Sequence, residues 1–62
     1  MANDEGIPEI FEYFEKGYTQ DLLVALAGRP GLLAETTLYI IGNHGTEKAV
    51  EFLEFVKRHM PV

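Results

Sequence analysis

A chain of 62 residues without a single cysteine has few ways to stabilise a fold. A domain of this size buries only about 60% of the surface that its unfolded chain exposes, so its core alone gives marginal stability. Small domains usually add disulfides, a metal ion or a partner chain. The absence of cysteine excludes the first of these. We therefore expect a single domain, and a partner chain as the most economical supplement to its core.

The net charge of −5 comes from the N-terminal part of the chain. Lys16 is the only basic residue there, and the carboxylates around it are Asp4, Glu5, Glu9, Glu12, Glu15 and Asp21. From residue 22 to residue 46 the only formal charges are those of Arg29 and Glu35. This nearly uncharged middle of the chain is where we expect burial or a partner.

The first expected element is a short amphipathic helix with an acidic outer face. Ile7, Ile10, Phe11 and Phe14 follow the spacing of one helix face. The preceding residues, 1–6, are polar and indicate a flexible tail, so the single helical domain is expected to span residues 7–62. Pro8 suits the first helical turn, and glycine at position 17 suits a left-handed helix end.

A second helix is expected from Thr19, as its N-cap, to Gly28. Its residues 22–27 are apolar on all sides. Residues 29–31 (Arg-Pro-Gly) indicate a turn, although the pattern also allows three helices in total if this segment only kinks a longer one. Residues 32–41 are ambiguous, because Thr36, Thr37, Ile40 and Ile41 favour strand and the preceding leucines favour helix. We predict helix, since no second strand is available to pair with it.

Residues 42–45 (Gly-Asn-His-Gly) form the clearest break in the chain, and Thr46 is expected to cap the helix that follows. Pro61 is expected to stop that helix. Its inner face should consist of Ala49, Phe52, Leu53, Val56 and Met60. The predicted fold is therefore all-α: a small bundle of three to four short helices, completed by dimerisation.

Candidate catalytic, cofactor or metal residues do not emerge from the sequence. The chain has neither cysteine nor serine, and no base stands at a suitable spacing beside a threonine or tyrosine hydroxyl. His44 and His59 lack the short spacing to a second ligand that metal sites in helices use. We therefore expect a non-enzymatic protein without a cofactor or metal.

A helix-turn-helix protein that binds DNA is the main alternative. The recognition helix would be residues 32–41, which contain no lysine or arginine, or the last helix, whose Lys57 and Arg58 lie far from its start. Because phosphate contacts dominate DNA affinity, the overall negative charge disfavours nucleic acid as a partner.

Membrane insertion is not expected, because Arg29, Pro30 and Glu35 interrupt the apolar stretch. The first ten residues show no signal-peptide pattern, which leads us to expect a cytoplasmic protein.

Apolar surface in excess of one small core is the most informative feature of the sequence. We predict a small acidic interaction module, of dimerisation or adaptor type, that forms a homodimer and offers a surface to a further protein partner. The interface is expected to include Leu23, Leu26, Leu33, Ile40, Val50 and Phe55. An accessory subunit of a larger enzyme is the remaining alternative.

Overall fold

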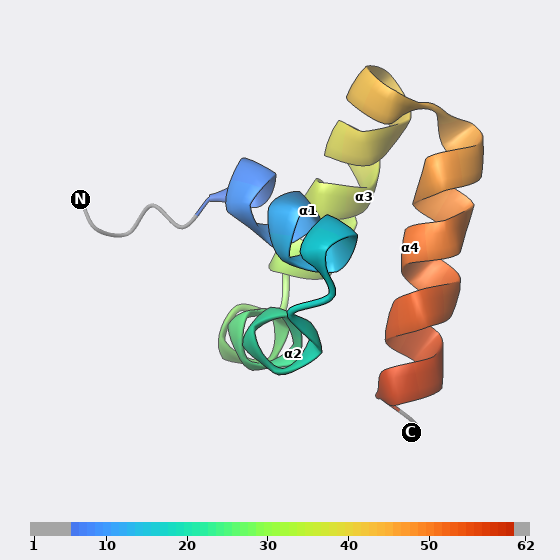
Figure 1. Ribbon diagram of the computed structural model, residues 1–62. Helices are drawn as coiled ribbons and strands as arrows, with labels where there is room; N and C mark the ends of the chain where they lie inside the picture. Colours follow the sequence, from blue (N-terminus) through green and yellow to red (C-terminus); the bar gives the residue numbers. More distant parts are fainter. Residues whose placement is uncertain (1–5, 61–62) are drawn as a thin grey trace.

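The computed structural model describes residues 6–60, in which all the regular secondary structure is helical. Four helices lie in this part: α1 (Ile7–Lys16), α2 (Thr19–Gly28), α3 (Leu32–His44) and α4 (Thr46–His59) (Figure 1). The all-α prediction is confirmed, including helix rather than strand for residues 32–41. Residues 1–5 of the predicted tail lie outside the described range, as does Pro61.

Both ends of α1 follow the local signals in the sequence. Gly6 is the N-cap, and its N–H donates to a carboxylate oxygen of Glu9 at 2.8 Å, which satisfies one of the free N–H groups at the helix start. Pro8 lies in the first turn. Gly17 ends the helix with φ at 81°, a left-handed conformation that glycine adopts without steric penalty.

The prediction that Thr19 and Thr46 are N-caps is wrong, because each is the first residue inside its helix. The Thr19 hydroxyl donates to the carbonyl of Gly17 at 3.5 Å instead of accepting a bond from the helix. Before α4 the cap is Gly45, whose φ of 101° and ψ of 157° lie in a region open almost only to glycine. This one glycine therefore makes the whole turn between α3 and α4.

Helix α3 continues through most of the segment that the sequence marks as a break. Gly42, Asn43 and His44 are all helical, and only Gly45 leaves the helix. The side-chain amide of Asn43 donates to the carbonyl of Tyr39 at 2.9 Å, and His44 stacks on a ring of α1. These contacts stabilise a last turn whose residues have low helix propensity on their own.

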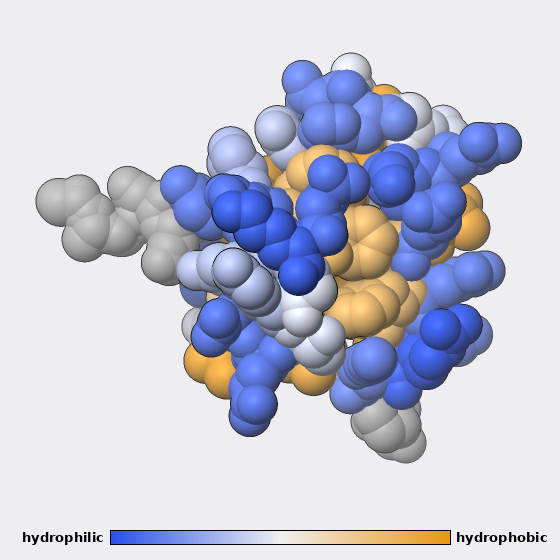
Figure 2. All heavy atoms as spheres, viewed as in Figure 1, coloured by the Kyte–Doolittle hydropathy of each residue, from blue (hydrophilic) through white to orange (hydrophobic). Residues whose placement is uncertain are grey.

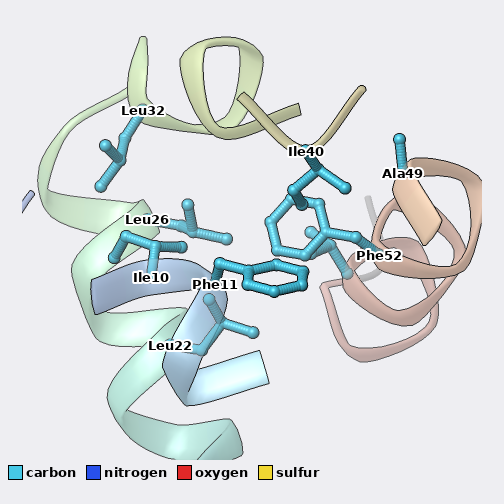
Figure 3. Close-up of a cluster of buried hydrophobic side chains, with 9 residues drawn as sticks. Ile10, Phe11, Leu22, Leu26, Leu32, Ile40, Ala49 and Phe52 are labelled. Carbon is cyan, nitrogen blue, oxygen red and sulfur yellow. The ribbon is translucent and has the colours of Figure 1, made fainter. Parts of the chain in front are cut away.

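Helix α3 occupies the centre of the bundle. It packs antiparallel beside α4 and also contacts α1, while α2 packs mainly on α1 (Figure 1). The buried apolar side chains converge from all four of these helices (Figure 3). They are Ile10, Phe11, Leu22, Leu26, Leu32, Ile40, Ala49, Phe52 and Val56. Because α4 packs chiefly on α3, one long side of this hairpin is left uncovered.

Thr36 is the one polar residue that is fully buried among residues 6–60. Its hydroxyl has no hydrogen-bond partner in this part of the chain. Thr37, its neighbour, donates to the carbonyl of Leu33 at 2.8 Å, the usual bond of a helical threonine. A buried hydroxyl without a partner lowers stability, so Thr36 is a local weakness of the core.

Candidate interaction surface

Two of the six residues predicted for an interface lie in the core of the single chain. Ile40 is fully buried and Leu26 is 5% exposed. The apolar run of α2 and the few charges of α3 do not indicate from sequence which side of each helix faces inward. The packing of α1 against both helices selects these side chains for the core, so they offer no surface to a partner.

The other four predicted residues lie on three different surfaces. Leu23 is half-buried on the outer side of α2, and Phe55 is half-buried beside Phe14 of α1. Leu33 and Val50 belong to the uncovered side of the α3–α4 hairpin, where Leu33 is half-buried and Val50 is 47% exposed. Leu33 is assigned to this side by the hollow that it lines with Leu53, and Val50 by its spacing of three residues from Leu53 on α4.

The uncovered side of the hairpin is rich in large apolar side chains. On α3 the most exposed is Leu38, at 69%, followed by Ile41 at 43%. On α4, Leu53 is 39% exposed, and Met60, the residue that follows the helix, is 37% exposed. The sequence prediction placed Leu53 and Met60 on the inner face of the last helix, but they lie at the edge of that face, where no described helix covers them.

We call this surface the hairpin face. Its α3 side consists of Pro30 in the preceding turn and of Leu33, Ala34, Thr37, Leu38 and Ile41. Its α4 side consists of Thr46, Val50, Leu53, Lys57 and Met60, which share one side of the helix by their spacing.

Two open hollows, of about 530 and 370 Å³, lie on the hairpin face. The larger is bordered by Pro30 and Leu38, the smaller by Lys57 and Met60, and Leu33 and Leu53 line both. The two hollows are therefore parts of one apolar groove between α3 and α4. Among residues 6–60, Lys57 is the only charged residue that lines it.

A second, smaller apolar patch lies on α2. Its residues are Thr19, Gln20, Leu23, Val24 and Ala27, which border one open hollow. Val24 is 68% exposed, as much as Leu38 on the hairpin face. The patch consists of one helix, so it offers a ridge to a partner and not a groove.

Aromatic side chains join α1 to α4 on the opposite side of α4 from the hairpin face. Phe14 lies 5.4 Å from both Phe52 and Phe55, measured between ring centroids, and Phe55 lies 4.4 Å from His59. Figure 2 shows hydrophobic side chains in a strip between α1 and α4, enclosed by hydrophilic residues. This strip holds the helices of one chain together.

Ion pairs occupy much of the charged surface. Glu12 accepts a hydrogen bond from the Lys16 ammonium at 2.8 Å, and this bond, together with charge attraction, raises the pKa of Lys16. Lys48 lies between Glu51, at 3.4 Å, and Glu15 of α1, at 3.7 Å. Because these pairs are exposed, they contribute little to stability, but they neutralise the basic residue near the start of α4.

No cluster of metal-binding side chains is present in the described part of the chain. Residues 6–60 contain no group of three or more histidine, aspartate or glutamate side chains placed to hold a metal ion. His44 stacks on Phe11, His59 packs at a tilt against Phe55, and the two histidines lie at different helix ends. Within the same residues, no helix has the length and apolar character needed to cross a membrane.

Comparison of the chain with models of known protein families, with curated proteins and with solved structures finds no match.

Proposed function

We propose that this chain is a small, non-enzymatic interaction module that forms a homodimer through the hairpin face. The observation that carries the proposal is the exposure of large apolar side chains, with Leu38, Val50 and Leu53 as its centre, on two adjacent helices. Covering such side chains with a partner stabilises the complex by about 25 cal/mol for each Å² of apolar surface removed from water.

The size of the hairpin face supports this role. Helices of 13 and 14 residues are about 20 Å long. Two helices packed side by side make the face about 20 Å wide, or roughly 400 Å² in area. Apolar patches of about 300–600 Å² are the largest that single-chain proteins usually expose, and they are often functional. The hairpin face lies within this range, on a chain of only 62 residues.

A second copy of the chain is the occupant that fits this surface. A two-fold dimer brings the same surface from both copies together, so a groove beside a protruding residue such as Leu38 can be filled by its own counterpart. Two faces bury about 800 Å² in total, less than the roughly 1,200 Å² of stable complexes. We therefore expect a dissociation constant in the micromolar range.

Sedimentation equilibrium over a range of concentrations tests the proposal. The wild-type chain should change from its 7.0 kDa monomer to a species of twice that mass. Leu38→Glu should keep the chain monomeric, because a carboxylate would be buried without a partner at the interface. Val24→Glu is the matched control, since Val24 is equally exposed on α2, and it should still dimerise.

A wild-type chain that stays monomeric up to several hundred micromolar would contradict the proposal, as would a dimer that Leu38→Glu leaves intact. If Val24→Glu prevents dimerisation and Leu38→Glu does not, the interface lies on α2 and not on the hairpin face. Purification of the native protein with a larger chain in fixed ratio would favour the accessory-subunit alternative.

A cytoplasmic location belongs to the same proposal, and fractionation of cells that produce the full chain tests it.

A further inference from the structure

The side of α4 that belongs to the hairpin face has the spacing of a helix that packs along another helix. Thr46, Val50, Leu53, Lys57 and Met60 follow one another at alternating steps of four and three residues, and all are exposed. Alternating steps of this kind form the seam of two helices packed side by side. Among residues 6–60, α3 borders this seam only along the groove, and the exposed side chains of the seam offer a surface to a further helix.

We propose that α4 packs antiparallel against α4 of a second copy, with the two-fold axis crossing the helix near Leu53. This inference rests on the proposed dimer and specifies its geometry. Glu47 of each copy then lies opposite Lys57 and Arg58 of the other.

The charges along α4 favour this geometry over the other two-fold arrangement of two hairpins. The helix begins with Glu47 in its first turn and ends with Lys57, Arg58 and His59 in its last. An axis parallel to the helices would gather the basic ends of both copies at one end of the dimer, together with both copies of Arg29. An axis across the helices separates the basic ends and places each against an acidic start, which lowers the electrostatic energy.

The ion pairs within the chain leave the required charges free. Lys16, Arg29 and Lys48 each have a carboxylate within 4.0 Å, whereas across residues 6–60 neither Lys57 nor Glu47 has an oppositely charged partner at that distance. Lys57 lies in an otherwise uncharged seam, where its apolar stem covers the groove and its ammonium reaches the rim. In the antiparallel dimer the rim of the second copy carries Glu47 at that place.

Charge reversal tests the pairing. Glu47→Lys and Lys57→Glu should each weaken the dimer about three- to tenfold at low salt, because the two-fold axis repeats every such contact. The double variant Glu47→Lys/Lys57→Glu should return to within about twofold of wild type, since both pairs are then restored with opposite sign. Glu12→Lys, on α1, changes the net charge by the same amount as Glu47→Lys, and it should leave the dissociation constant unchanged.

Disulfide trapping gives an independent measurement, because the chain contains no cysteine of its own. A disulfide requires two Cα atoms within about 7 Å. Leu53→Cys, near the axis, should form a disulfide-linked dimer on oxidation. Thr46→Cys and Met60→Cys should each form little alone, but an equimolar mixture should yield the mixed disulfide.

The possible outcomes distinguish a failure of the antiparallel arrangement from a failure of the chain to dimerise. A wild-type chain that never dimerises overturns both. A dimer in which the double charge variant is weaker than either single variant overturns the antiparallel arrangement alone, as does a dimer in which Met60→Cys links only to itself. Restored affinity together with the mixed disulfide establishes the arrangement.

Discussion

The imidazole of His44 lies stacked on the ring of Phe11, with 4.1 Å between ring centroids and 19° between the planes. The contact joins the last turn of α3 to the middle of α1. We expect His44→Ala to be less stable than His44→Phe by about 1 kcal/mol, because only phenylalanine retains the stacked contact. Urea denaturation of both variants, followed by circular dichroism, measures the difference. Equal stability would mean that the stack does not hold the end of α3.

Two glycines at the end of α3 should respond in opposite ways to the same substitution. Gly42 lies inside the helix with nothing within 4 Å of an added Cβ, so Gly42→Ala should raise stability by about 0.5–1 kcal/mol. Gly45 has φ at 101°, where alanine is strained, so Gly45→Ala should lower stability by about 2 kcal/mol. Thermal unfolding of the two variants compares them directly. A stabilising Gly45→Ala would contradict the turn described for this residue.

The buried hydroxyl of Thr36 predicts a stabilising substitution in the core. Thr36→Val keeps the branched shape and removes a hydroxyl that has no partner within residues 6–60, so it should raise the free energy of unfolding by about 1 kcal/mol. Thr37→Val is the matched control: it removes a hydroxyl that is bonded to the carbonyl of Leu33, and it should give no such gain. The urea midpoints of the two variants provide the measurement.

The sequence predicts the ends of α1 because they depend on neighbouring residues only. Pro8 fits one helical turn and Gly17 adopts the left-handed conformation by itself. The end of α3 could not be found in this way. Gly42, Asn43 and His44 have low helix propensity, and it is the stack on Phe11, a residue distant in sequence, that stabilises their helical conformation.

The sequence predicts apolar excess but not where it lies. Leu53 and Met60 follow the spacing of the inner face of α4, yet they are exposed, because the width of a buried face depends on how many helices cover it. Leu26 lies in a run that is apolar all round, so periodicity cannot distinguish its inner side. The alternating four and three spacing from Thr46 to Met60 is the signal in the sequence that indicates the outward seam.

Duplex DNA should not bind measurably to the protein at physiological salt, because the described basic residues do not form a continuous surface. Helix α3 carries no lysine or arginine. At the start of α4, Lys48 lies between Glu15 and Glu51. At its end, Lys57 and Arg58 share one shallow hollow with Glu54.

Fluorescence anisotropy with a labelled duplex at about 0.15 M salt tests this prediction, since phosphate contacts give the salt-dependent affinity that DNA-binding proteins share. We expect no change in anisotropy up to tens of micromolar protein. Sub-micromolar binding that weakens steeply with salt would revive the helix-turn-helix alternative. Under that alternative Lys57→Glu/Arg58→Glu should abolish the binding, because phosphate affinity would depend on these two side chains in both copies of a dimer.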